Sequence, residues 1–518
     1  MTKNKSNLIK GTLVLTLAGV ITRLIGFFYR IFLSNSMGPE VLGIYQLVFP
    51  VYGICFTIFA SGIQTAISTL VANELGQKHY VGISKVLKKG ILMSVSTALV
   101  LSFLTYRYSD FLAISVLREA NCVSSIKLLA LAFPFCGITS CINGYYYGLK
   151  KAGVPAATQL LEQIVRVITV FFLAGYAGNG DIKVTSDLAV LGLVIGEFAS
   201  QLYNIGSMYF NRTSKEINAL AEASEKHNVQ NTCEKESKSL TLQLFKISLP
   251  LTANRLLISI LHSVEAILIP SMLKLYGLSS SEALSIYGVL TGMSVPFIMF
   301  PSAITNSLSV LLLPTISEAQ SSKNTDMIKK TTSISIKYSL LIGIISSGLF
   351  ISFGQELGNI VFHNKMAGSF LTTLAWLCPF LYITTTLSSI INGLGLAHLT
   401  FINSVVGLSV RILMILYFVP KQGITGYLTC LLVSQLVITC FDGLIVMKHI
   451  KPPFQASDFI LKPSIIVAGC SYIMYRIYEY FRPQIQGLPA LIGFCTLLCV
   501  LIVILLGITK AVSLKDFK

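Results

Sequence analysis

The sequence has 518 residues, of which 53% are hydrophobic and only 12% are charged, and its mean hydropathy is +0.74. This composition excludes a soluble globular protein of this length and predicts a chain whose surface mostly faces lipid. The net charge of +17 does not indicate a nucleic-acid-binding protein, because the lysines and arginines mark separate loops rather than one basic face or arm.

Apolar runs of about 17–25 residues, the length that crosses a bilayer as a helix, predict about fourteen transmembrane helices and an all-α polytopic membrane protein. Those of the first half lie at 8–33, 41–71, 87–106, 123–148, 154–177 and 186–210. Those of the second half lie at 242–273, 284–313, 332–354, 369–395, 399–419, 423–447, 460–480 and 488–510. Several runs are longer than a straight crossing needs, so we expect tilted or bent helices.

The loops on the two sides of this arrangement differ in their basic residues. If the N-terminus is cytoplasmic, the loops on the outer side hold only Arg107, Arg118, Lys183, Lys274, Lys365, Lys421 and Arg482. The cytoplasmic loops hold roughly three times as many lysines and arginines, which is the asymmetry that orients membrane proteins. We therefore predict an even number of crossings with both termini in the cytoplasm.

Short motifs recur in the same order in the two halves of the chain. LGIYQ at 42–46 recurs as LSIYG at 284–288, and SGIQTAISTL at 61–70 recurs as SAITNSLSVL at 302–311. Because each half begins inside and has an even number of helices, we expect two lobes of the same orientation, related by a pseudo-twofold axis along the membrane normal. Substrate would then bind between the lobes.

This duplication predicts four segments. They are an N-lobe of helices 1–6 (1–210), a polar cytoplasmic linker (211–241), a C-lobe of helices 7–12 (242–450), and a C-terminal helix pair with a tail (451–518).

Eight ionisable residues lie deep within the predicted helices. They are Arg23, Glu162, Arg166, Glu197, Arg255, His262, Glu265 and Arg411. A central arginine costs about 2.5–3.5 kcal/mol even on the permissive insertion scale, so these arginines must face water, a partner or a ligand. Arg30 lies seven residues after Arg23 on the same face of the first helix, nearer its end.

The spacing of these residues suggests some partners. Glu162 and Arg166 are four residues apart in the favoured orientation, which fits either a structural ion pair or a role in substrate binding or gating. Glu265 is placed to neutralise Arg255 or His262, or to carry a coupling ion.

The excess of deep arginine over carboxylate favours an anionic ligand, because the planar guanidinium binds phosphate through two hydrogen bonds. Arg411 sits at the repeat position of Arg166 but has no acidic neighbour on its own helix. No P-loop, HExxH or GxSxG motif is present, so we expect no enzymatic activity, no cofactor and no metal site. An ion gradient or the membrane potential would then drive transport.

Three stretches together carry a resemblance: TRLIGFFYRI at 22–31, MGPEVLGIYQLVFPVY at 37–52 and GYYYGLKKAGVPAATQLLEQIVRV at 144–167. They resemble the stage V sporulation protein B group of polysaccharide exporters, in the multidrug/oligosaccharidyl-lipid/polysaccharide (MOP) flippase superfamily. The resemblance implies a flippase that moves an undecaprenyl-pyrophosphate-linked glycan across the bacterial cytoplasmic membrane. The glycan it implies first is lipid II, the peptidoglycan precursor, with spore cortex synthesis as the setting.

The lipid II flippases of that superfamily carry a pattern like SRxxGFxRD in the first helix. Arg23 matches its first arginine, whereas Tyr29 replaces the second arginine and Arg30 replaces the aspartate. The resemblance therefore implies headgroup binding by Arg23 more directly than by Arg30.

We expect a transporter that accepts a pyrophosphate-sugar headgroup in a cationic cavity and works by alternating access. The expected headgroup contacts are Arg23, Arg30, Arg255, Arg411 and Arg166, and the residues expected in charge pairing or ion coupling are Glu162, Glu265 and His262. The expected partners are a lipid-linked oligosaccharide, membrane lipids, a coupling ion (H⁺ or Na⁺) or the membrane potential, and cell-wall synthases. Two alternatives stay open, a cation-coupled multidrug antiporter of the same superfamily and a non-transporting membrane scaffold for cell-wall synthesis.

Overall fold

The computed structural model describes residues 2–177, 184–211, 215–217, 219–220, 233–482 and 487–509, and the side chains of 2–18 and 233–239 lie outside that description. Every regular element in these residues is a helix, so the predicted all-α class is confirmed. About half of the predicted linker, 211–241, lies outside the described residues.

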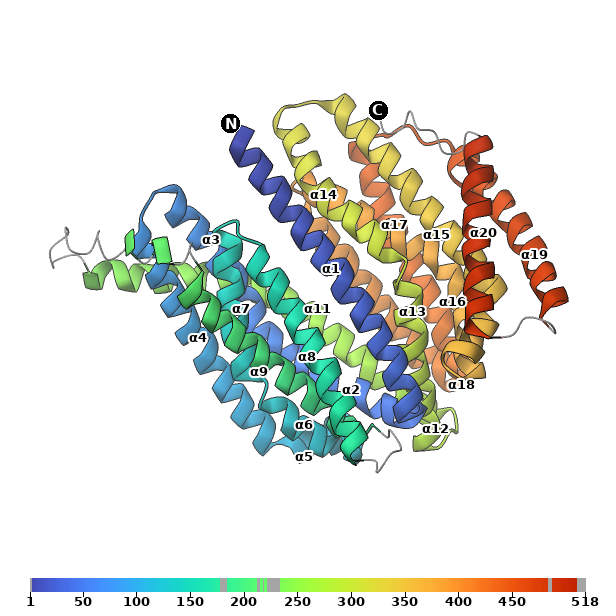
Figure 1. The fold of residues 1–518 in the computed structure, drawn as a ribbon, viewed down its shortest axis with the longest axis horizontal. Coiled ribbons are helices and arrows are strands. Elements are labelled where there is room, and N and C mark those ends of the chain that lie inside the picture. Colours follow the sequence, from blue (N-terminus) through green and yellow to red (C-terminus); the bar gives the residue numbers. More distant parts are fainter. Residues whose placement is uncertain are drawn as a thin grey trace. The chain divides into compact units, whose positions relative to one another are not determined.

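The first of two compact units holds Met1–Tyr29 and Ile44–Ile267. Its elements (Figure 1) are α1 (Thr2–Met37), α2 (Pro39–Phe56), η1 (Thr57–Ser61), α3 (Gly62–Gly76), α4 (Tyr80–Arg107), α5 (Ser109–Phe111), η2 (Leu112–Val116), η3 (Ala120–Cys122), α6 (Val123–Ala130), α7 (Phe133–Gly148), α8 (Gly153–Ala177), α9 (Ser186–Phe210) and α11 (Cys233–Leu275). The ends of α1 and α11 and the start of α2 belong to the second unit.

The second unit holds Arg30–Gly43 and Leu268–Lys518. Its further elements are α12 (Ser280–Gly288), η4 (Val289–Ser294), α13 (Val295–Met299), α14 (Ser302–Ser321), α15 (Thr325–Val361), α16 (Lys365–Leu374), η5 (Ala375–Leu377), α17 (Cys378–Gly393), α18 (Ala397–His449), η6 (Ser457–Leu461), α19 (Lys462–Phe481) and α20 (Leu488–Ile508). The boundaries between the two units fall within α1, α2 and α11. The predicted lobes have their boundary at the linker instead, so the predicted lobe boundaries stay a prediction.

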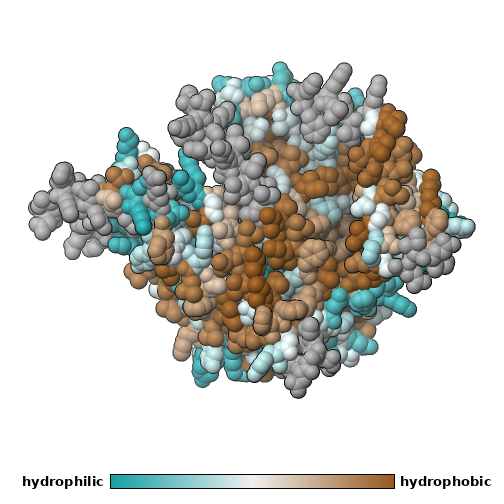
Figure 2. All heavy atoms as spheres, in the orientation of Figure 1, coloured by the Kyte–Doolittle hydropathy of each residue, from teal (hydrophilic) through white to brown (hydrophobic). Residues whose placement is uncertain are grey.

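Eleven helices in the described residues are long and apolar enough to cross a membrane, or twelve if the bent pair Ala120–Ala130 and Phe133–Gly148 is one span. On the face drawn in Figure 2, hydrophobic side chains cover the middle of the helices and hydrophilic ones gather toward their ends. This pattern places the middle of the helices in hydrocarbon. The predicted total of fourteen spans stays a prediction.

Helix α18 shows that one continuous helix can contain more than one membrane span, so the number of helices underestimates the number of spans. Its 53 residues would be about 80 Å long as one straight helix, more than twice the hydrocarbon thickness. Gly423 interrupts it with φ 60° and ψ −139°, a conformation that is essentially limited to glycine. The predicted spans 399–419 and 423–447 meet at this residue.

The same packing partners recur in both units. In the first unit, α7 packs against α3, α4 and α9, and α6 packs against α4. In the second unit, α17 packs against α14, α15 and α18, and α16 packs against α15. The order of these helices along the chain is the same in both cases, which is the structural counterpart of the repeated motifs.

Helix α11 runs antiparallel to α2 and α3 in the first unit. Ser263 donates a hydrogen bond to the Pro50 carbonyl at 3.3 Å, and Thr252 lies against Gly62, where a larger side chain would collide with it. This close packing holds the deep residues of α11 against the region where α2 is joined to α3 by the π-helical turn Thr57–Ser61.

Candidate functional site

An ion pair lies on the buried face of α8. Arg166 Nη2 contacts Glu162 Oε1 one turn earlier on the same helix, and the two side chains are 14% and 18% exposed. The i, i+4 spacing places both groups on one side of the helix, as predicted. The structural ion pair is therefore formed, and a part in substrate binding or gating stays a prediction.

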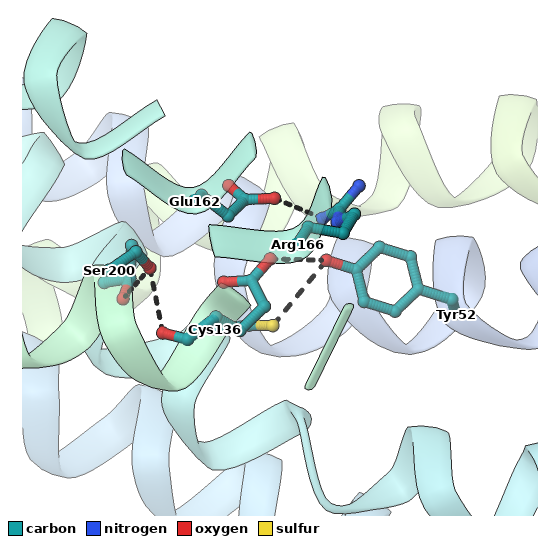
Figure 3. A network of polar contacts seen from close by, with 7 residues as sticks. Tyr52, Cys136, Glu162, Arg166 and Ser200 are labelled. Atoms are coloured by element: carbon teal, nitrogen blue, oxygen red, sulfur yellow. Dashed lines mark hydrogen bonds and ion pairs between the residues drawn. The ribbon is translucent and has the colours of Figure 1, made fainter. Parts of the chain in front are cut away.

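A second carboxylate reaches the same region from α9. Glu197 is only 7% exposed, and the Tyr52 hydroxyl of α2 lies 3.5 Å from its Oε1. That hydroxyl also lies 3.6 Å from the Sγ of Cys136 on α7. We call Tyr52, Cys136, Glu162, Arg166 and Glu197 the N-unit cluster, and Figure 3 shows how Tyr52, Cys136, Glu162 and Arg166 lie close together.

Two glycines explain how α8 and α9 come so close. A Cβ on Gly196 would meet the carbonyl of Glu162 and the backbone of Arg166, and a Cβ on Gly192 would meet Val170. Small residues of this kind let helix backbones approach each other inside a membrane. Glu197, next to Gly196, is thereby carried to the Arg166 side of α8.

The N-unit cluster holds two carboxyl groups and one guanidinium. Within the described residues, the ion pair of Arg166 is with Glu162, and the hydrogen bond of the Glu197 side chain comes from the neutral Tyr52 hydroxyl. A buried charge that lacks a paired opposite charge is strongly disfavoured. The cluster is therefore suited to exchange of a proton.

Arg255 is held at the π-helical turn between α2 and α3. Its Nη1 donates to the Ser61 carbonyl at 2.7 Å and to the Ser61 hydroxyl at 3.0 Å. Ser61 ends the π-helical turn Thr57–Ser61, and single π-helical turns inside α-helices occur frequently at functional sites. The exposed remainder of the guanidinium keeps donors available for an anion.

Glu265 was predicted to pair with Arg255 or His262, and the structure shows a contact with His262. His262 Nδ1 lies 3.6 Å from Glu265 Oε2, and the Glu265 side chain is only 8% exposed whereas that of His262 is 58% exposed. The contact joins positions three residues apart on α11, as their spacing suggests. A role of the two residues in charge pairing or ion coupling stays a prediction.

Arg411 is buried in the second unit. It is 8% exposed, and its Nε donates to the Ser434 hydroxyl at 2.7 Å. Both residues lie in α18, on opposite sides of the break at Gly423. The contact thus ties the two halves of α18 to each other.

The predicted headgroup residues are divided between the compact units. Arg23, Arg166 and Arg255 belong to the first unit, and Arg30 and Arg411 to the second. Arg23 and Arg30 are both exposed on α1. Their convergence on one cavity therefore stays a prediction.

Sequence reasoning singled out Glu197 as a deep charge without giving it a role, and it missed Tyr52 and Cys136. These two residues come from helices far apart in the chain, and neither carries a charge that would mark it. In the described residues, no three His, Cys, Asp or Glu side chains gather as metal ligands.

The first unit also contains an apolar cavity of about 670 Å³. It lies between α2, the end of α4, η2 and α11, and is lined by Pro50, Val51, Ile54, Cys55, Leu104, Thr105, Tyr108, Phe111, Leu112, Val116, Leu117, Ser263 and Ile267. Its walls carry no charged side chain, so it suits hydrocarbon and not a phosphate headgroup.

Comparison with known proteins shows a family match and related membrane proteins. Residues 8–320 match the family described as polysaccharide biosynthesis protein. The chain is 26% identical over 524 residues to stage V sporulation protein B of Bacillus subtilis (strain 168), covering 99% of this chain and 98% of that protein.

The lipid II flippase MurJ is similar in both sequence and structure. Its Bacillus subtilis sequence is 21% identical over 487 residues, covering 90% of this chain and 87% of that protein. A MurJ structure in an inward closed conformation has a TM-score of 0.68 at 15% identity and covers 95% of this chain and 98% of that chain. An inward-facing multidrug resistance MATE family transporter of the MOP superfamily has a TM-score of 0.63 at 16% identity, covering 83% of this chain and 98% of that chain.

Proposed function

Because the chain belongs to the polysaccharide biosynthesis protein family, we propose that it is a flippase that moves an undecaprenyl-pyrophosphate-linked glycan across the cytoplasmic membrane. The substrate we propose first is lipid II, used in spore cortex synthesis. The chain is a multi-pass membrane protein with the fold of MOP superfamily transporters. Alternating access of the two lobes would carry the headgroup while the polyprenyl tail stays in lipid.

The observation that carries this proposal is the match of residues 8–320 to the family together with the similarity to stage V sporulation protein B along nearly the whole chain. A protein of that relation is expected to share the general task of moving a lipid-linked glycan. Lipid II is proposed because MurJ, named a lipid II flippase, is also related in sequence.

The arginines are proposed to bind the pyrophosphate. Arg255 supports this best, because Ser61 fixes part of its guanidinium and the rest is exposed, and a pre-oriented guanidinium binds phosphate well. Arg23, Arg30 and Arg411 are proposed as further contacts. Arg166 is a weaker one, because Glu162 already pairs with it.

The proposed orientation has both termini and the linker 211–241 in the cytoplasm, with the headgroup entering from that side. It rests on the excess of basic residues in the loops assigned to the inside.

A multidrug antiporter is the competing transport function, and the likeness to a MATE transporter fold supports it. That structure covers 83% of this chain whereas MurJ covers 95%, so the flippase fold accounts for more of the molecule. The deep arginines also suit an anionic substrate better than a cationic drug.

The test compares two cargoes in the same reconstituted vesicles. Proteoliposomes containing the full chain are loaded with lipid II in one series and with ethidium in another, and translocation of each is followed against protein-free vesicles. Lipid II movement without ethidium efflux is the expected result. Ethidium efflux alone would favour the antiporter, and movement of neither cargo would contradict lipid II transport and leave the scaffold as the better explanation.

A further inference from the structure

The N-unit cluster differs from a simple ion pair because it contains two carboxyl groups and only one guanidinium. Glu162 and Arg166 already neutralise each other within α8. Glu197 adds a second carboxyl group that is 7% exposed, and the side-chain contact described for it is with Tyr52. One positive charge thus serves two potential negative charges in the interior of the first unit.

The other titratable groups around this carboxyl group are phenols and a thiol, which carry no positive charge in either protonation state. Tyr52 and Cys136 face Glu197 from α2 and α7, while Tyr29 of α1 and Tyr45 of α2 face Arg166. None of them supplies a positive charge to Glu197. A carboxyl group in such surroundings is most stable when it carries a proton, since desolvation penalises only its charged form.

We propose that the N-unit cluster is the proton-binding site of the transporter, with Glu197 as the group that takes up and releases one proton. This inference rests on the proposed transport function and names its coupling ion. With the proton bound, Glu197 is neutral and Arg166 pairs with Glu162. When the proton leaves, two carboxylates compete for one guanidinium, and the charge on Glu197 draws Arg166 toward α9.

Binding or release of the proton would change how the helices around the cluster pack. Glu162 and Arg166 lie on α8, Glu197 on α9, Tyr52 on α2 and Cys136 on α7. Because α8 and α9 touch through Gly192 and Gly196, Arg166 changes partner by a side-chain movement across an existing contact. A change of partner alters the packing of four helices at once, which is the kind of bistable element that conformational switching needs.

The donor atoms favour a proton over a metal cation. A sodium ion needs several oxygen ligands, as other hard cations do. The Glu197 carboxyl group contacts the Tyr52 hydroxyl, which in turn lies 3.6 Å from the sulfur of Cys136. The nearby Ser200 hydroxyl donates to the backbone carbonyl of Glu197 and not to its carboxyl group. Within the described residues this set is poor in oxygen, so a proton is the ion that fits.

The first experiment detects the proton without any transport. The full chain is reconstituted in lipid, and the infrared carbonyl band of protonated carboxylic acids is recorded while the pH is raised. The expected result is a band that is present in the wild type, disappears on titration, and is lost in Glu197→Gln. Glu356→Gln is the matched control, because Glu356 is also a buried glutamate but pairs with Arg482 at 3.0 Å in the second unit; it should keep the band.

If Glu197→Gln folds poorly, Tyr52→Phe is a second variant that tests the same carboxyl group. Removing the hydroxyl that contacts Glu197 should shift the frequency of the band but not its amplitude. A band unchanged in both Glu197→Gln and Tyr52→Phe would overturn the proposal.

The second experiment measures coupling in lipid II proteoliposomes with the membrane potential clamped and sodium absent. A pH gradient should change the translocation rate of the wild type, whereas Glu197→Gln should move lipid down its own gradient at a rate that no longer depends on the pH gradient. An equal response of wild type and Glu197→Gln, or a response to a sodium gradient in place of the pH gradient, would contradict the proposal. If the wild type moves no lipid, the transport function fails, and the infrared experiment still decides whether Glu197 binds a proton.

Discussion

Arg166 and Glu162 lie one helical turn apart in the interior of the first unit, where neither side chain is well exposed. In such surroundings, removal of one member leaves the other as an uncompensated buried charge, which typically costs about 3–5 kcal/mol. Removal of both leaves no unpaired charge, so the double variant should be damaged less than the sum of the two single changes.

This predicts the outcome of a double-mutant cycle. Glu162→Gln and Arg166→Gln should each lower the thermal unfolding midpoint of the detergent-solubilised protein, and the double variant should recover part of the loss. The exposed pair Arg476 and Glu479, 3.0 Å apart on α19, is the matched control, for which changes of about 0.2–1 kcal/mol are expected. Strictly additive effects of Glu162→Gln and Arg166→Gln would show that the pair has no energetic coupling.

At the residue scale, the sequence predicted contacts within one helix better than contacts between helices. The pairing of Glu162 with Arg166 follows from the i, i+4 spacing alone. Spacing left Glu265 with two partners, and the structure places His262 within 3.6 Å of it. The approach of Tyr52 to Glu197 depends on how α2 and α9 are rotated about their axes, which no local pattern encodes.

Among the elements, the start of α2 and α12 lie so close together in the second unit that their backbones are in direct contact. A Cβ on Gly288 would meet the Pro39 carbonyl and the backbone of Gly43, and a Cβ on Gly43 would meet the backbone of Leu284. These neighbours are backbone atoms, so they cannot turn aside as a flexible side chain would.

Gly288→Ala should therefore lower the stability of the protein by about 1–3 kcal/mol, because the added methyl group forces the two helices apart. Gly469→Ala is the control, since the same methyl group would meet nothing within 4 Å in the exposed middle of α19. That change should leave stability unchanged or raise it by about 0.5–1 kcal/mol through helix propensity. Equal thermal midpoints of the two variants would contradict the close backbone contact.

Elements were predictable from apolar run length, but their internal breaks were not. The predicted span 284–313 is divided in the structure into α12, η4, α13 and α14, with Pro296 near the start of α13 and Pro301 just before α14. A proline disturbs a helix without saying whether the chain bends, becomes π-helical or stops. The outcome depends on the neighbouring helices, and these become known only with the fold.

For the whole molecule, the resemblance to the stage V sporulation protein B group, carried by three motifs, is confirmed by the 26% identity along 99% of the chain. The all-helical class followed from hydropathy, because only helices satisfy the backbone in lipid without forming a closed barrel. The substrate is a different matter, since a shared fold serves flippases and drug antiporters alike. We propose that substrate choice depends on the deep arginines, among them Arg255, whose guanidinium is held by Ser61.

Headgroup recognition is tested most directly by measuring how lipid II translocation depends on the deep arginines. Arg255→Ala and Arg23→Ala are compared with the wild type in proteoliposomes at equal reconstitution, and Arg107→Ala at the exposed end of α4 is the matched control. Loss of a hydrogen bond to a charged group costs about 1.5–3 kcal/mol, so each of the two deep variants should translocate lipid II roughly tenfold more slowly or worse, while Arg107→Ala keeps the wild-type rate. Wild-type rates in both Arg255→Ala and Arg23→Ala would contradict headgroup recognition by these arginines.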